Sequence, residues 1–167
     1  MERPARQKTK EQQTAVQLAR PEDIDAWMEL VDRVKADFPG LETEAALAEH
    51  RATVLRFIEK SSAVCAAGEG RILRALLFSK EGGMLCFLAV DPASRRQHIA
   101  RRLVDFMLAR MDAGRTVTVT TYREGDPRGA AARAFYRRMG FLEGKLREEF
   151  GCPVQEFTLK GKPAGQR

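Results

Sequence analysis

Residues 88–103 of this 167-residue chain read LAVDPASRRQHIARRL, a short apolar run followed by a turn and a basic segment. The apolar run ends at Val90 and is typical of the end of a strand, because it is short and bounded by a turn signal. Asp91-Pro92 forces the turn, since proline has no backbone N–H and disfavours the helical conformation of the residue before it. Apolar residues at helical spacing then predict a helix over 94–111.

The start of this predicted helix has the properties of a phosphate-binding site. Its first turn presents backbone N–H groups without an intrahelical partner, at the positive end of the helix dipole. Arg95, Arg96 and Arg101 flank the turn and add guanidinium groups that suit phosphate oxygens. The alternative is a solvated basic helix face, and the helix start alone does not decide between the two.

Hydrophobic periodicity predicts strands and helices on both sides of this stretch. Before it we expect a strand at 14–18, helices at 24–36 and 43–60, and strands at 63–67, 71–79 and 84–90. After it we expect a strand at 116–122, a helix at 129–138, and strands at 141–147 and 154–159. This order implies a mixed α/β sheet covered by helices.

Two blocks of the sequence resemble the GNAT superfamily of N-acetyltransferases. The family signature, Arg/Gln-x-x-Gly-x-Gly/Ala after a strand ending in Val-x-Pro, falls on residues 95–100, RRQHIA. Residues 132–141, ARAFYRRMGF, are similar to the family's second block, which ends in Phe-Tyr-x-x-x-Gly-Phe. The resemblance implies an α/β (α+β) fold with a GNAT-like mixed, mostly antiparallel central sheet of about seven strands flanked by about four helices. It also implies acetyl-CoA (coenzyme A) as the cofactor.

The resemblance assigns roles to particular residues. Acetyl-CoA would lie between the strand that ends at Val90 and the strand near residues 118–121, with its amides on the backbone of the first. A backbone N–H near residues 88–90 would stabilise the oxyanion. The expected cofactor-binding residues are Leu88, Ala89, Val90, Arg95, Arg96, Gln97, His98, Ile99, Ala100, Arg101 and Phe135.

Tyr136 is the expected catalytic residue, as the acid that protonates the leaving thiolate. The alternative for Tyr136 is packing beside Phe135 and Phe141. The general base is open, because Met84 stands where some relatives have a glutamate. The remaining candidates are a water chain or the loop acids Glu124, Asp126, Glu148 and Glu149, each of which also fits a solvated surface charge.

Two further departures concern binding. His98 stands where the family usually has its first glycine, so the backbone approaches phosphates less freely there. Gly129 stands where the second block often has an asparagine. Trp27, Phe38 and Phe150 could line an apolar part of the acceptor site, and core packing explains them equally well.

The predicted function is acetyl-CoA-dependent N-acetyl transfer to a primary amine of a small molecule or protein, by direct attack in a ternary complex. The alternatives are a non-catalytic acyl-CoA sensor and a basic RNA- or ribosome-binding module, which the net charge of +6 favours. Against the module, aromatic residues are not interleaved with the basic ones. We expect a small-molecule or peptide acceptor, no nucleic acid or membrane partner, and a monomer or homodimer.

Composition predicts one domain at 14–161, between a flexible basic N-terminal tail at 1–13 and a short C-terminal tail at 162–167. The lack of a long apolar segment favours a cytoplasmic location. The widely spaced cysteines, Cys65, Cys86 and Cys152, are predicted to be structural, the first two as small hydrophobic residues. No metal site is expected. His50, on the apolar stripe of its helix, is predicted to lie in or beside the core.

Overall fold

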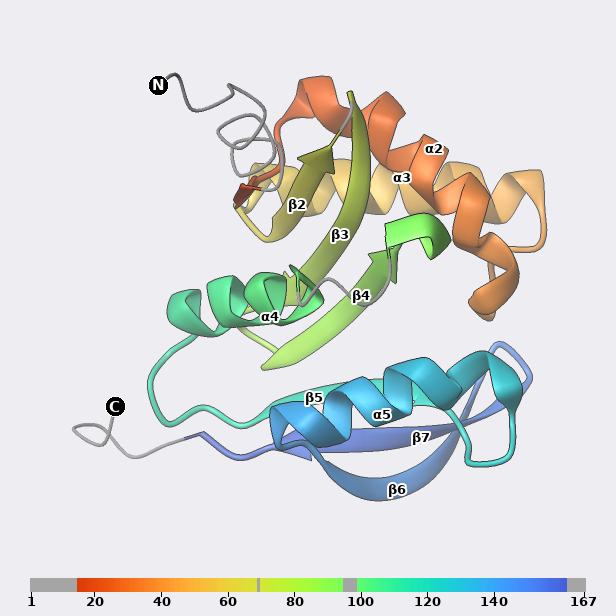
Figure 1. Cartoon of the computed structure of the whole chain (residues 1–167), viewed down its shortest axis with the longest axis vertical. Helices are drawn as coiled ribbons and strands as arrows, with labels where there is room; N and C mark the ends of the chain where they lie inside the picture. The colour runs from red at the N-terminus through yellow and green to blue at the C-terminus, as the bar shows by residue number, and fades with distance from the viewer. Residues whose placement is uncertain (1–14, 69, 95–98, 162–167) are drawn as a thin grey trace, which may run out of the picture.

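The structure is a computed structural model that describes residues 15–68, 70–94 and 99–161, so both predicted tails lie outside it. The described residues contain four α-helices, four short 3-10 helices and seven strands (Figure 1). In chain order they are β1 (Val16–Leu18), η1 (Pro21–Asp23), α2 (Ile24–Val34), η2 (Lys35–Asp37), α3 (Glu44–Glu59), β2 (Ala63–Gly68), β3 (Arg71–Ser79), β4 (Met84–Val90), η3 (Pro92–Ser94), α4 (Ile99–Arg110), β5 (Val117–Tyr122), η4 (Pro127–Gly129), α5 (Ala130–Met139), β6 (Leu142–Glu149) and β7 (Cys152–Leu159).

The described strands form one sheet in the order β1-β2-β3-β4-β5-β7-β6. Neighbouring strands are antiparallel except for β4 and β5, which are parallel. The predicted α/β (α+β) fold with a mixed, mostly antiparallel sheet is therefore confirmed. The three strands β2, β3 and β4 form the predicted run of antiparallel neighbours.

Helices cover the two faces of the sheet in pairs. The buried residues of α2 recur at helical spacing and pack with α3 in one core cluster, which includes Trp27 and Val54. The helices α4 and α5 pack on the opposite face in a second cluster, which includes Leu103 and Tyr136. Figure 1 shows α4 and α5 on the near side of the sheet and α3 behind it.

Two helix ends differ from the predicted ones. The helix α2 ends at Val34 and continues as a 3-10 turn, Lys35–Asp37. Ser94 belongs to the 3-10 turn after β4 and not to a helix, because its N–H donates to the carbonyl of Asp91, three residues back, at 2.9 Å. By contrast, α3 begins as predicted, since the Thr43 hydroxyl accepts a hydrogen bond from the Ala46 N–H and caps the helix.

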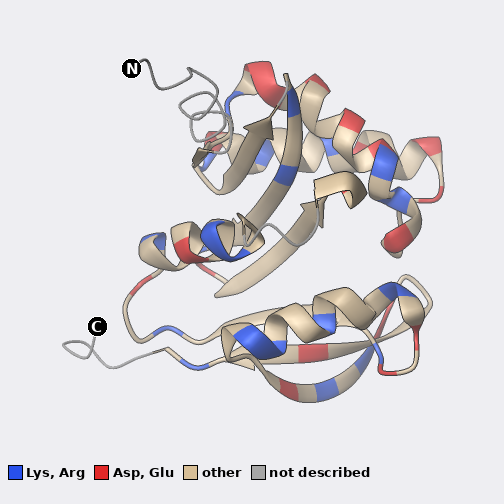
Figure 2. Cartoon of the chain, in the orientation of Figure 1, with Lys and Arg blue, Asp and Glu red and all other residues tan. Residues whose placement is uncertain are grey.

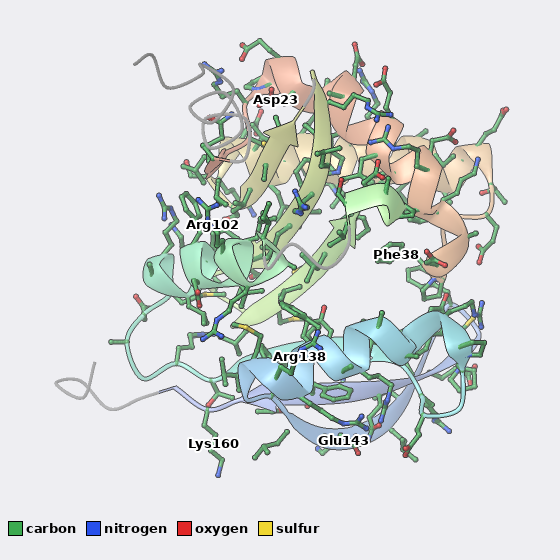
Figure 3. The ribbon with its side chains drawn as sticks, viewed as in Figure 1. Asp23, Phe38, Arg102, Arg138, Glu143 and Lys160 are labelled. Carbon is green, nitrogen blue, oxygen red and sulfur yellow. The ribbon has the colours of Figure 1, made fainter. Side chains whose placement is uncertain are left out.

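A buried arginine fastens α5 to the C-terminal strands. Arg133 is 3% exposed and donates to the Tyr122 carbonyl at 3.1 Å, to Gln155 Oε1 at 2.8 Å and to Glu143 Oε1 at 3.0 Å. Arg137 donates to the same carboxylate, and this hydrogen bond lowers the pKa of Glu143, which Figure 3 labels beneath α5. Because the buried charge is paired and hydrogen-bonded, it fixes α5 against β5, β6 and β7.

Candidate active site

The parallel strands β4 and β5 meet only at their amino-terminal ends. Met84 pairs with Thr118, and the Thr118 N–H donates to the Gly83 carbonyl at 2.9 Å. No further pair joins the two strands in the described residues, although β4 stays paired with β3 as far as Val90 and β5 with β7 as far as Tyr122. The strands therefore separate toward their carboxyl ends (Figure 1), and we call this opening the β4–β5 divergence.

A β-bulge in β4 accompanies the divergence. Leu77 pairs with Phe87 and Phe78 pairs with Leu85, so Cys86 is the extra residue. A bulge bends its strand and reverses the faces that its side chains take. Leu85 accordingly packs with α4, whereas Phe87 packs with α2 and α3.

The bulge corrects one cysteine prediction. Cys65 is 1% exposed and lies in the core as predicted, and burial raises the pKa of its thiol to about 12. Cys86 is exposed and not buried, although it lies inside an apolar run. It is the extra residue of the bulge, and it has no partner opposite it on β3. Its thiol lies on the strand that borders the divergence.

The edge of β4 that faces the divergence has no strand partner beyond Met84 in the described residues. The predicted residues Leu88, Ala89 and Val90 lie on this edge, where Ala89 is 1% exposed and its two neighbours are half-buried. The Asp91 N–H donates to the Leu73 carbonyl, so alternation along β4 turns the backbone groups of Ala89 toward β3 and those of Leu88 and Val90 toward the free edge. An extended ligand could pair with these two residues as an added strand would.

Two arginines hold the turn that follows β4. Arg33 of α2 donates from Nε to Asp91 Oδ2 at 2.7 Å and from its terminal nitrogen to the Ile72 carbonyl at 2.9 Å. Arg74 of β3 is 1% exposed and donates to the Ser94 carbonyl at 2.7 Å. Desolvation lowers the pKa of Arg74, partly offset by Asp91. Both contacts fix the backbone of the turn between Asp91 and Ser94.

Asp91 is 4% exposed, and its pKa lies below the ordinary value. Burial alone would raise this pKa, but hydrogen bonds from the Ala93 N–H and from Arg33 outweigh it. The carboxylate therefore stabilises the fold above roughly pH 4, and this contribution is lost as the pH falls through the lowered pKa.

We expect Asp91→Asn to lower the free energy of unfolding by about 1–3 kcal/mol at neutral pH, because Arg33 loses its charged partner. In urea titrations, the difference from the wild type should shrink as the pH falls below roughly 4 and through the lowered pKa of Asp91, where the wild-type carboxylate becomes protonated. Asp32→Asn, which removes an exposed pair with Lys35, is the matched control and should cost less than about 1 kcal/mol. An equal loss at neutral and acid pH would contradict the role of the charge.

The other predicted cofactor residues are placed only in part. Arg95, Arg96, Gln97 and His98 lie outside the described residues. Ile99 is 7% exposed and packs in the core, Ala100 is half-buried, and the exposed Arg101 lies 3.9 Å from Asp105. Phe135 is half-buried on α5 beside Tyr136. Arg102, labelled on α4 in Figure 3, contributes positive charge near Arg74.

Tyr136 lies on α5 and is 4% exposed. Its ring packs against Phe135, Phe141 and Phe157, with centroids 5.5, 5.4 and 6.0 Å away. Burial raises the pKa of Tyr136, since a phenolate would lose its hydration, so the hydroxyl keeps its proton at neutral pH. Packing and the protonated state required of an acid thus coexist, and the catalytic role stays a prediction.

The α2–α3 loop and the β6–β7 turn meet at Gly40 and Phe150. A Cβ placed on Gly40 would lie 2.7 Å from the Phe150 ring, so only glycine admits this contact. Phe150 is 77% exposed, whereas Phe38 of the same loop packs 4.7 Å from Phe87. Trp27 is fully buried, which confirms core packing as its interpretation.

His50 lies at the boundary of the core, as predicted. Its ring lies 4.8 Å from that of Phe87, and burial lowers its pKa to about 4. The imidazole is therefore neutral at neutral pH.

The acids proposed for the general base differ in position. Glu124 and Asp126 lie in the loop after β5, whereas Glu148 is an exposed residue of β6 and not of a loop as predicted. Glu149 is half-buried, and both of its carboxylate oxygens lie within hydrogen-bond distance of Thr120 Oγ1, at 3.1 and 3.0 Å. The described residues contain no group of three or more His, Cys, Asp or Glu side chains that could hold a metal ion.

Sequence reasoning missed Arg33, Arg74 and Thr120. The lone charge inside the apolar run 72–78 is a signal that could have found Arg74, because a central strand rarely places an arginine in the core without a partner. Arg33 and Thr120 carry no local signal, since their partners lie 58 and 29 residues away in the sequence.

Comparison with known proteins agrees with this geometry. Residues 59–143, slightly more than half of the 167 residues, match the family model described as the acetyltransferase (GNAT) domain. The chain therefore belongs to the GNAT family of acetyltransferases. No curated protein matches the sequence.

Solved structures share the fold at low sequence identity. A GNAT-family acetyltransferase from Bacillus cereus matches 89% of this chain and 98% of its own, with a TM-score of 0.70 and 18% identity. The ribosomal-protein-S18-alanine N-acetyltransferase from Escherichia coli matches 92% and 97%, with a TM-score of 0.64 and 21% identity. An acetyltransferase from Salmonella typhimurium, solved with its cofactor acetyl-CoA, matches 92% and 96%, with a TM-score of 0.68 and 11% identity.

Proposed function

We propose that this chain is an N-acetyltransferase that moves the acetyl group of acetyl-CoA to a primary amine, without a covalent enzyme intermediate. Acetyl-CoA is the cofactor of this acetyltransferase domain. The observation that carries the proposal is the β4–β5 divergence, which leaves a strand edge free beside the start of α4. In this arrangement the backbone of residues 88–90 binds the pantetheine amides, and residues 95–101 bind the pyrophosphate.

The bound cofactor supplies an activated acetyl group as a thioester. The amine nitrogen attacks the carbonyl carbon, the carbon–nitrogen bond forms, and the carbon–sulfur bond breaks. A backbone N–H near residues 88–90 stabilises the oxyanion. Tyr136 gives its proton to the departing sulfur and regains one from solvent, while the ammonium substrate loses two protons, so one proton is released in each turnover.

The distribution of arginines argues against the nucleic-acid alternative. Figure 2 shows basic residues spread over many elements of the chain, not gathered on one. Several of them donate to carboxylates or carbonyls within the protein: Arg33, Arg74, Arg123, Arg133, Arg137 and Arg147. Guanidinium groups held in this way are poorly available for phosphate contacts.

The kind of acceptor that we propose, an amine of a peptide or a small molecule, is supported by a structural relative. The Escherichia coli relative is named for acetylating a protein alanine, which supports a peptide or small-molecule amine here as well. No helix in the described residues is long and apolar enough to cross a membrane. A cytoplasmic location and a monomeric or homodimeric state stay predictions of the sequence.

We expect acetyl-CoA to protect Cys86 from alkylation by iodoacetamide, because the exposed thiol borders the divergence. Desolvation raises the pKa of the Cys86 thiol, so labelling is best done near pH 8.5, and mass spectrometry of the peptides reads each cysteine separately. Half-protection should fall at micromolar acetyl-CoA, about −8 kcal/mol of binding free energy.

The Arg95→Ala/Arg101→Ala double variant is the control for the phosphate site. It should require roughly tenfold or more acetyl-CoA for the same protection, since charge-assisted contacts are lost. Labelling of Cys86 that is indifferent to acetyl-CoA in the folded protein would refute the proposed cofactor site. Protection without turnover of any amine would instead favour an acyl-CoA sensor.

A further inference from the structure

One carboxylate lies on the wall of the divergence that α4 and α5 leave uncovered. Along β5, Val117 and Val119 face α5 in the core, so Thr118 and Thr120 face the other side. Thr120 lies two residues beyond the last pair between β4 and β5. Its hydroxyl holds Glu149, which therefore lies beside the opening of the divergence.

Glu149 has acceptor capacity to spare. A hydroxyl donates a single proton, whereas a carboxylate has about four acceptor positions. Among the described residues no cation forms an ion pair with Glu149. Arg147 of β6 pairs with Glu156 at 3.0 Å, and Arg123, which follows β5, donates to the carbonyls of Val154 and Arg147.

An unsatisfied polar group, the Tyr122 hydroxyl, belongs to a residue on the same face of β5. Tyr122 is 3% exposed, and its hydroxyl has no hydrogen-bond partner in the described part of the chain. Desolvation raises the pKa of Tyr122, and the nearest charge, Arg128, opposes this shift. The Arg128 guanidinium lies 4.1 Å from the centroid of the Tyr122 ring and is paired with Asp126. A buried phenol without a partner is costly unless a ligand or water supplies one.

Apolar surface adjoins these polar groups. Phe150 follows Glu149 directly, takes a left-handed backbone conformation with φ of 51°, and keeps 77% of its surface exposed. The contact of its ring with Gly40 holds the ring between the β6–β7 turn and the α2–α3 loop. An exposed aromatic ring beside a free carboxylate favours a ligand that has both a cation and an apolar body.

We propose that Glu149 is the specificity-determining residue for the acceptor: it binds the ammonium group, while Phe150 receives an apolar body. The acceptor is then a cationic primary amine without a carboxylate beside the amino group, since a second anion would face Glu149. Tyr122 supplies a further hydrogen bond to the acceptor or its water. This inference rests on the proposed acetyl transfer.

The test compares 2-phenylethylamine with phenylalanine, which has the same ring and amino group and adds a carboxylate. With acetyl-CoA as donor, we expect the wild type to use 2-phenylethylamine with a kcat/KM at least about tenfold higher. Glu149→Gln should raise the KM for 2-phenylethylamine about tenfold with little change in kcat, because a charge-assisted contact is lost. Glu81→Gln, on an exposed residue of the β3–β4 turn, is the matched control and should behave as the wild type.

The variant should fold, since the glutamine carbonyl can still accept from Thr120, and protection of Cys86 by acetyl-CoA verifies this. Equal use of the two amines, or equal KM values for Glu149→Gln and Glu81→Gln, would overturn the inference and leave acetyl transfer standing. Protection of Cys86 without turnover of 2-phenylethylamine would overturn this acceptor class. Absence of protection in the wild type would remove the proposed function and the inference together.

Discussion

Tyr136→Phe should lower kcat by at least about tenfold, while the protein remains folded and binds acetyl-CoA. The substitution removes only the hydroxyl that we propose as the acid, and general acid catalysis typically contributes a hundredfold or more. The aromatic contacts with Phe135, Phe141 and Phe157 involve the ring, which phenylalanine retains. The effect should therefore appear in turnover and not in stability.

Steady-state kinetics with a saturating amine, together with thermal unfolding, separates the two roles of Tyr136. A packing role predicts a small change in stability and unchanged kcat, and that result would refute the acid assignment. Burial raises the pKa of this phenol, so its ionisation should not reduce kcat below roughly pH 10. The rise of the rate at lower pH should instead follow deprotonation of the amine.

The raised pKa also constrains how the acid works. A buried phenol is a weaker acid than one in water, so transfer to a neutral thioester sulfur would be unfavourable. Charge develops on sulfur only as the carbon–sulfur bond breaks. Tyr136 would then act late, and it would stabilise the departing thiolate by hydrogen bonding before the proton moves.

Much of the fold could be predicted from the sequence because its signals are local. The short apolar runs 71–79 and 84–90 and the turn at Asp91-Pro92 appear in the structure as predicted, as β3, β4 and the 3-10 turn that follows. The resemblance also identified the family before any geometry was known. The predicted helix ends near Val34 and Ser94 were wrong, because the chain forms 3-10 turns there. Hydrophobic periodicity does not distinguish a terminal 3-10 turn from an α-helical one.

The site could be predicted only in part because its contacts are non-local. The exposure of Cys86 depends on a bulge in the pairing of β4 with β3. The apolar sequence of β4 alone does not show how its residues pair with those of β3. Glu149 was one of four equivalent acids in the sequence, and its contact with Thr120 distinguishes it. The predicted phosphate-binding residues 95–98 lie outside the described residues, so that part of the site remains a proposal.

Gly129 shows how a departure from the family pattern follows from packing. Its backbone has φ of −96° and ψ of −8°, which any residue adopts, so conformational freedom does not explain the glycine. A Cβ at this position would lie 2.8 Å from Tyr122 Cβ and 3.2 Å from the Tyr122 carbonyl oxygen. The asparagine common in the family cannot be accommodated unless β5 or the start of α5 moves.

Gly129→Asn should therefore lower the free energy of unfolding by about 2–3 kcal/mol, the cost of overpacking a buried site. This corresponds to a fall in Tm of roughly 5–10 °C for a chain of this size. The direction of the change in stability is informative. Replacing a glycine in ordinary helical geometry usually stabilises a protein, because it reduces the entropy of the unfolded state. Here the contact with Tyr122 should outweigh that gain.

Ala130→Asn is the matched control, since it introduces the same side chain one residue later, at an exposed position of α5. It should cost less than about 1 kcal/mol, the difference in helix propensity. Thermal unfolding of both variants measures the contrast. Equal Tm values for the two variants would mean that β5 moves to accommodate the added side chain. Packing would then not explain why this chain has Gly129 where the family often has asparagine. A large fall confined to Gly129→Asn would show that Tyr122 and the start of α5 are packed as described, which also fixes the buried phenol beside the proposed acceptor site.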